Sequence, residues 1–189
     1  MLPAAFGIGA FVLFVLFPKQ TNAGLVTAAG TIRNLGAAFG PVIGMGQAWN
    51  AATVRLTAAK LRTLHNLNAD PMMVAAMVKI ESRYNASAKR YEAHLNDSSY
   101  GLMQTMLKTA QWLHGLGYKG KDYPTAKTLV DGETSLYFGM AYIDYLAKYK
   151  GKARDERWIV ESYNGGPGNS NKQTQTHYAK YLQAKTEVA

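Results

Sequence analysis

The sequence predicts a mainly α-helical fold with at most a very small β element. Apolar residues recur at the three- and four-residue intervals of amphipathic helices, and no segment shows the strict alternation of a strand. Helix-start signals such as Asp70-Pro71 precede these segments. A chain of 189 residues, 48% of them hydrophobic and 17% charged, is long enough for one domain with a substantial core.

The composition excludes several classes of site. There is no cysteine, which excludes a disulfide framework, a thiolate metal site and a cysteine nucleophile. No His/Asp/Glu group has metal-ligand spacing, so no metal or cofactor is expected. The four histidines are scattered and are expected to be surface or hydrogen-bonded residues: His65, His94, His114 and His177.

The charge balance favours an anionic partner. Lys and Arg number 21 against 12 Asp and Glu, a net charge of +9. No nucleic-acid motif is visible, so a nucleic acid is not expected and an acidic wall polymer suits the excess better.

The N-terminus resembles a secretory signal peptide. Residues 2–17 are apolar, Pro18 ends the run, and Thr21-Asn22-Ala23 offers a small-x-small cleavage site after Ala23. Residues 1–23 are therefore expected to direct the protein out of the cytoplasm, to the cell envelope or the medium. No Lys or Arg precedes the run, which differs from the usual start of a signal peptide. An uncleaved membrane anchor is the alternative, although the run is shorter than the ~20 residues of a membrane span.

Residues 24–68 are expected to precede the main domain, which occupies 69–189. The stretch 24–46 contains six glycines and is expected to be a linker or membrane-proximal segment. Residues 47–67 regain helical character, with Leu61, Leu64 and Leu67 at three-residue steps after Trp49 and Leu56.

The main domain begins with a helix at Asp70-Pro71, whose apolar face carries Met73, Met77 and Ile80. A polar spacer follows, and residues 105–114 are expected to form a second helix. Three further helices are expected: one from Asp131 to Gly151 with an apolar stripe at Leu136, Met140, Ile143 and Ala147, a short one capped by Asp155, and a last one carrying Tyr178, Tyr181 and Leu182.

Glu81 is the first candidate for chemistry. It ends the apolar pattern of the first helix, so its carboxyl is expected at the border of the core, where burial raises a carboxyl pKa. A carboxyl of this kind can act as a general acid, for example towards a glycosidic oxygen. A structural ion pair is the alternative role.

Two other segments are candidates for substrate contacts. The turn Gly101-Leu102-Met103-Gln104 either offers backbone and amide groups to a sugar or inserts Leu102 and Met103 into the core. Tyr163-Asn164 precedes Gly165-Gly166, and either faces the acid or ends a helix.

The order of these segments resembles the catalytic domain of lytic transglycosylases, the soluble and membrane-bound murein transglycosylases related to goose-type lysozyme. Helix-end Glu-Ser is followed by GLMQ, then by DGETSLYFGMAYIDYLAKY, then by SYNGGPG. The stretches RYEAHL, GLMQT and TAQWL resemble the branch of this family found in green plants and algae. The resemblance covers about residues 70–185 and implies a lysozyme-like, goose-type helical domain.

The resemblance also implies an activity and its residues. Such enzymes cleave the β-1,4 bond between N-acetylmuramic acid and N-acetylglucosamine in peptidoglycan and form 1,6-anhydromuramic ends. Glu81 would be the catalytic acid and then the base. Substrate contacts are implied at Ser82, Gly101, Leu102, Met103, Gln104, Met106, Tyr163 and Asn164, with Ser98 and Ser99 in place of the serine that the family uses beside the acid.

The spacer between Glu81 and Gly101 is longer than in most bacterial members and contains Asp97. Goose-type lysozyme has an additional acid before its glycine turn, so Asp97 is either a second acid or a loop acid with local hydrogen bonds. A lysozyme-like hydrolase of peptidoglycan or chitin and a non-catalytic wall-binding protein therefore remain alternatives. The sequence leaves endo or exo action and the oligomeric state open.

Overall fold

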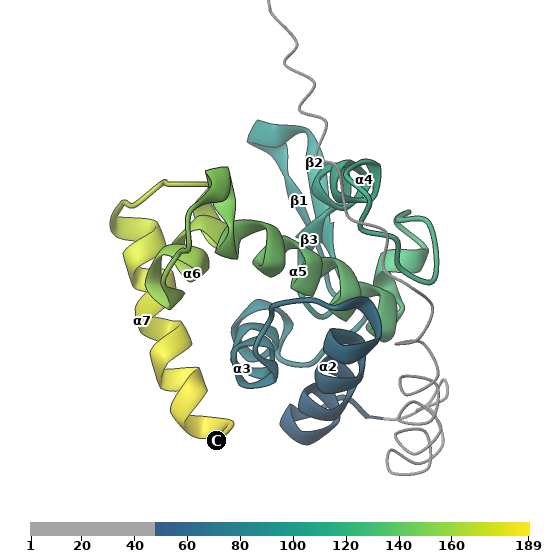
Figure 1. Ribbon diagram of the computed structural model, residues 1–189, viewed down its shortest axis with the longest axis horizontal. Coiled ribbons are helices and arrows are strands. Elements are labelled where there is room, and N and C mark those ends of the chain that lie inside the picture. The colour runs from purple at the N-terminus through teal and green to yellow at the C-terminus, as the bar shows by residue number, and fades with distance from the viewer. Residues whose placement is uncertain (1–47) are drawn as a thin grey trace, which may run out of the picture. The chain divides into compact units, whose positions relative to one another are not determined.

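Helix α5 (Gly132–Ala147) crosses the middle of the structure, a computed structural model that describes residues 48–189. Helices α2 and α3 lie on one side of α5, and a small sheet with α4 lies on the other (Figure 1). Helices α6 and α7 pack against each other beyond one end of α5. The helices around α5 are α2 (Ala51–His65), α3 (Pro71–Ser82), α4 (Leu107–Gly115), α6 (Glu156–Gly165) and α7 (Lys172–Glu187).

The mainly α-helical class is confirmed. Six α-helices and one three-stranded sheet make up the regular structure of residues 48–189, together with three short 3₁₀ turns, η2 (Ala93–Leu95), η3 (Thr128–Val130) and η4 (Tyr149–Gly151). The expected signal peptide or anchor at 1–23 and the glycine-rich stretch at 24–46 lie outside the described residues. Within 48–189, none of the helices has the length and apolar character needed to cross a bilayer.

Three aspartates start helices as the sequence predicts. Each side chain accepts a hydrogen bond from the backbone N–H three residues further on, a group that has no partner inside the helix. The bonds run from Met73 to Asp70 at 3.2 Å, from Thr134 to Asp131 at 2.9 Å and from Trp158 to Asp155 at 2.8 Å.

The core lies around α5. Most of the predicted stripe of this helix is buried, with Leu136 and Met140 at 0% exposure and Ile143 at 1%, while Ala147 is partly buried. Met77 of α3, Leu113 of α4 and Tyr181 of α7 belong to the same cluster. Since residues from most of the helices share this cluster, the positions of the helix ends are fixed relative to one another.

The leucines of helix α2 do not all lie on its buried face. Leu61 is buried, but Leu56 and Leu64 are 56% and 63% exposed. The buried face instead carries Val54 and Ala58, because small side chains let α2 pack closely against α3 and α5.

The polar spacer after α3 forms the sheet. Strands β1 (Lys89–Glu92), β2 (Asp97–Tyr100) and β3 (Thr105–Met106) pair antiparallel in that order, and Ser99 lies opposite Met106. The helix expected at 105–114 therefore begins two residues late, at Leu107, since Thr105 and Met106 are used by the sheet.

The turn between β2 and β3 depends on Gly101. Its φ of +71° lies in the left-handed region, and a Cβ placed there would overlap the carbonyl oxygen of Leu129 and lie 2.5 Å from Oγ of Ser135. Only glycine fits both the backbone conformation and the space.

Gly101→Ala should therefore lower the free energy of unfolding by about 2–4 kcal/mol, from the left-handed backbone and the overlap together. Urea denaturation of the full chain measures this. The control is Gly115→Ala, because a Cβ at Gly115 meets no atom within 4 Å and should leave the stability within about 0.5 kcal/mol. Equal stability of the two variants would contradict the assigned role of the turn.

Candidate active site

Glu81 lies in the last turn of α3, and its side chain is only 10% exposed. The chain turns away from the helix directly after it, through Arg83 and Tyr84 with φ of 52° and 65°. Burial raises the pKa of the Glu81 carboxyl to about 7, and the positive charge of Arg90 on β1 opposes that rise in part. The carboxyl is therefore present both protonated and ionised near neutral pH, which suits a group that first gives and then takes a proton.

A histidine from a distant part of the chain contacts this carboxyl. Nε2 of His177 on α7 lies 3.3 Å from Oε1 of Glu81, and its side chain is 13% exposed. The ring N–H is not aligned as a hydrogen bond, and among the described residues Nε2 has no other partner. Burial lowers the pKa of His177 to about 4, with further lowering from Lys180 and Arg90, so the ring is neutral when Glu81 titrates.

Tyr163 connects α6 with the turn after β2. Its hydroxyl donates to the backbone oxygen of Met103 at 2.8 Å and lies 3.3 Å from Oγ1 of Thr105. Burial and then the nearby charge of Glu81 raise the pKa of this hydroxyl, so it stays protonated.

Gln104 fixes the turn from inside. Its amide nitrogen donates to the carbonyl oxygens of Ala88 at 3.1 Å and Gly101 at 2.9 Å. Its amide oxygen accepts from Oγ of Ser99 at 3.0 Å. These bonds join the start of β1, β2 and the turn, so the observed contacts of Gln104 stabilise the loop.

The other residues proposed for substrate contact differ in their burial and in their hydrogen bonds. The side chains of Leu102 and Met103 are fully buried, and Oγ of Ser82 donates to Val78 of its own helix at 3.2 Å. Met106 precedes α4 and is partly exposed. Ser98 is nearly buried in β2, and Asn164 has a buried Oδ1 with no hydrogen-bond partner within residues 48–189.

Asp97 caps a helix. Its Oδ1 accepts from the backbone N–H of Ser98 at 2.8 Å, and its Oδ2 accepts from the N–H of Lys108 in the first turn of α4 at 3.0 Å. Both oxygens are therefore engaged, and the negative charge lies at the helix end where it is most favourable. No group of three or more His, Asp or Glu in the described part of the chain is arranged to hold a metal ion.

The site thus joins the end of α3, the β2–β3 turn, α6 and α7 around one buried carboxyl.

A family model described as the transglycosylase SLT domain matches residues 61–185, which is most of the chain. The chain belongs to the transglycosylase SLT family. No curated protein gives a significant match. SLT membership supports peptidoglycan lytic transglycosylase activity in general, and with it a peptidoglycan substrate and a place of action outside the cytoplasm.

The position of His177 in this SLT domain differs from the expectation of a surface or hydrogen-bonded histidine. The signal was in the spacing of α7: His177 follows the buried Thr174 by three residues and precedes the buried Tyr181 by four. These intervals place all three side chains on one helix face.

The raised pKa of Glu81 predicts how stability depends on pH. The folded state binds the proton more tightly than the unfolded state, so the stability of the protein falls as the pH rises from about 4.5 to about 7. Glu81→Gln removes this loss and should raise the free energy of unfolding at pH 8 by on the order of 2 kcal/mol, with little difference at pH 4.5.

Urea unfolding at the two pH values measures the effect. Glu133→Gln is the control, because Glu133 forms a partly exposed ion pair with Lys60 at 3.3 Å. If Glu81→Gln has the same stability as the wild type at both pH values, the carboxyl is not held in a desolvated state.

Proposed function

We propose that the protein is a lytic transglycosylase that cleaves the β-1,4 bond between N-acetylmuramic acid and N-acetylglucosamine in peptidoglycan and closes the muramic end as a 1,6-anhydro sugar. The observation that carries this proposal is a single buried carboxyl with a pKa of about 7, that of Glu81, within the SLT match. Such a group can act as an acid and then as a base at neutral pH.

In the proposed reaction Glu81 gives its proton to the glycosidic oxygen as the bond from that oxygen to C1 breaks. The acetamido group of the muramic sugar stabilises the positive charge at C1. The Glu81 carboxylate then takes the proton of the sugar's 6-hydroxyl, whose oxygen bonds to C1. One proton leaves the carboxyl and one returns, and no water is consumed.

The surroundings of Glu81 support intramolecular attack over hydrolysis. The 6-hydroxyl is tethered to the reacting sugar, which gives it a large advantage over water through proximity. Asp97 is the acid that a goose-type hydrolase would use to activate water, but both of its oxygens already accept backbone hydrogen bonds. The observed contacts of Asp97 are thus those of a structural residue that holds β2 and the start of α4 in place, which supports a scheme with one catalytic acid.

Substrate contacts are proposed at Asn164 and at the turn that Tyr163 holds. The unpartnered Oδ1 of Asn164 can accept a hydrogen bond from a sugar hydroxyl or amide, and a buried oxygen of this kind normally has a partner. Tyr163 helps to hold the turn beside the acid through its bond to Met103. The excess of 9 positive charges suits the anionic polymer.

Mass spectrometry of the products from purified peptidoglycan tests the proposal. We expect muropeptides that weigh one water less than hydrolysed ones, and a loss of about 10²-fold or more in turnover for Glu81→Gln. Glu133→Gln and Asp97→Asn should keep the same products. Reducing ends in the peptidoglycan products that disappear in Asp97→Asn would show a lysozyme-like hydrolase instead. The release of reducing ends from chitin oligomers, used as a second substrate, would show the same. Binding to insoluble peptidoglycan without any product would show a wall-binding protein.

We also propose that residues 1–23 direct export and that 69–189 carry the catalytic residues. The apolar run 2–17 and the cleavage site after Ala23 support the first part. The intact mass of protein from its native compartment should correspond to a chain that begins at Gly24. A chain that keeps Met1 in the cytoplasmic fraction would contradict export, and a membrane-bound chain that keeps Met1 would show an uncleaved anchor.

A further inference from the structure

His177 and Glu81 meet from two helices that are far apart in the sequence. The two side chains are 13% and 10% exposed, and Nε2 of the ring lies 3.3 Å from Oε1 of the carboxyl. Nε2 is also one of the few buried polar atoms without a hydrogen-bond partner in the described part of the chain. A buried polar atom normally has a partner, so one that lies unpaired at van der Waals distance from a reactive carboxyl needs an explanation.

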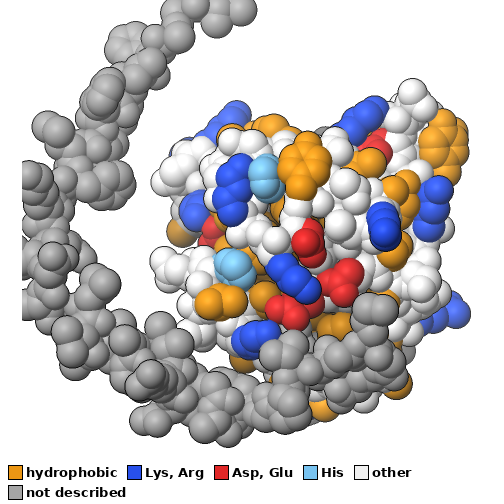
Figure 2. Space-filling model, turned by 90° about the vertical axis from the view of Figure 1, so that its right-hand side faces the viewer, with side chains coloured by type: hydrophobic (Ala, Val, Ile, Leu, Met, Phe, Trp, Pro, Cys, Tyr) orange, Lys and Arg blue, Asp and Glu red, His pale blue; other side chains and the backbone are white. Residues whose placement is uncertain are grey.

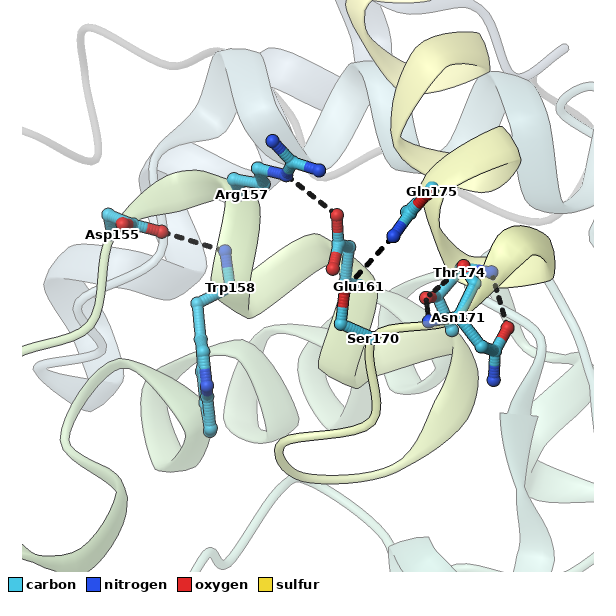
Figure 3. Close-up of polar contacts among 8 residues, drawn as sticks. All are labelled: Asp155, Arg157, Trp158, Glu161, Ser170, Asn171, Thr174 and Gln175. Atoms are coloured by element: carbon cyan, nitrogen blue, oxygen red, sulfur yellow. Dashed lines mark hydrogen bonds and ion pairs between the residues drawn. The ribbon is translucent and has the colours of Figure 1, made fainter.

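The position of His177 is fixed by the start of α7. Asn171 caps this helix in a reciprocal pair with Thr174: the Asn171 side chain accepts from the Thr174 N–H at 3.1 Å, and the Thr174 hydroxyl accepts from the Asn171 N–H at 2.9 Å. Gln175 reaches back to Ser170 at 3.5 Å, and Figure 3 shows these contacts beside the loop from α6. The register of α7 is thereby set three residues before His177.

Ion pairs hold the rest of α7 against its neighbours. Lys185 binds Glu156 at the start of α6 with an N–O distance of 2.6 Å, and Glu187 pairs with Lys79 of α3. Lys79 lies two residues before Glu81 on the same helix. The two helices that carry the histidine and the acid are therefore joined directly. The fold itself holds His177 and Glu81 close together.

Burial, and then the charges around the imidazole, lower the pKa of His177 and keep the ring neutral. Lys180 on α7 and Arg90 on β1 both disfavour a positive charge on His177. Two further cations on the packed helices are paired with carboxylates: Lys79 of α3 with Glu187, and Arg157 of α6 with Glu161 at 2.7 Å (Figure 3). A neutral imidazole carries one N–H and cannot act as a counter-ion.

We propose that His177 is a positioning residue whose Nε2–H donates a hydrogen bond to Glu81 once that carboxyl has given up its proton. This inference rests on the proposed function, because it gives the histidine a role between the two proton transfers. Before cleavage the protonated carboxyl needs no hydrogen-bond donor at Oε1. This agrees with the observed contact, in which Nε2 of His177 and Oε1 of Glu81 are close but do not form an aligned hydrogen bond. Afterwards a shift of a few tenths of an ångström would form the bond and keep the carboxylate oriented for the 6-hydroxyl proton.

No proton moves from His177 in this scheme. The hydrogen bond stabilises the ionised form of Glu81 and leaves the neutral form unaffected, so losing the donor should raise the pKa of Glu81. It should also slow the chemical step without weakening substrate binding, because the bond exists only after the proton has left.

Two substitutions separate this role from packing. His177→Phe keeps a planar ring and removes the donor, whereas His177→Gln keeps an N–H donor of similar reach. The control is His114→Phe on α4, whose ring contacts Lys119 and Tyr123. The measurements are kcat and KM on peptidoglycan, the pH dependence of kcat, and the Glu81 midpoint from NMR titration of ¹³C-labelled glutamate.

For His177→Phe we expect kcat to fall by about tenfold with KM within twofold, the Glu81 midpoint to rise by about one pH unit, and the alkaline limb of kcat to move up with it. His177→Gln should recover most of both effects, and His114→Phe should match the wild type. An unchanged or lowered midpoint in His177→Phe would overturn the proposal, as would equal losses of kcat in both His177 variants with unchanged midpoints. The NMR readout needs no turnover, so it remains decisive even if Glu81→Gln shows that the proposed function is wrong.

Discussion

The burial of one carboxyl without a counter-charge is the constraint on which the site depends. Removing Glu81 from water disfavours its ionised form, and a cation in direct contact would cancel that effect and leave an ordinary ion pair. The positive charge of Arg90 opposes the effect of burial only in part, and the side chain in direct contact with the carboxyl is the neutral ring of His177.

The segments around Glu81 are distant in sequence, so it is the packing of the helices that brings them together. Helix α5 lies in the middle and gives α2, α4 and α6 a common surface, while α3 packs on α2 and α7 packs on α3 and α6. The only β structure in residues 48–189 supports the polar turn that approaches the site, and Gln104 and Tyr163 bind that turn from two sides. On the face shown in Figure 2 the positively charged side chains lie scattered among acidic and apolar ones and do not gather at one place.

The sequence was informative wherever a local rule decides the structure. Aspartate caps marked the starts of three helices, and the apolar intervals of α5 marked its buried face, because both depend on residues a few positions apart. The sheet could not be predicted, since its strands are two to four residues long and mostly polar. They are held by pairing with one another, which leaves no periodic pattern of apolar residues in the sequence. In α2 the leucine spacing does not mark the buried face, because Leu56 and Leu64 are exposed. For the site, Glu81 and Tyr163 could be proposed from motifs, but the contact of His177 with the acid depends on how α7 packs on α3.

The capping of α4 by Asp97 has a consequence for how this scaffold could change its chemistry. An acid that is free to activate water would have to release the N–H of Lys108, and the first turn of α4 would lose its electrostatic anchor to β2. Loss of such a cap typically costs about 1 kcal/mol, so a route to a hydrolase through this residue would begin with a less stable protein. A compensating cap, such as Ser or Asp at position 106 in place of Met106, would have to come first. The order of substitutions in any directed evolution towards hydrolysis is thus constrained by the folding of a helix that takes no part in the reaction.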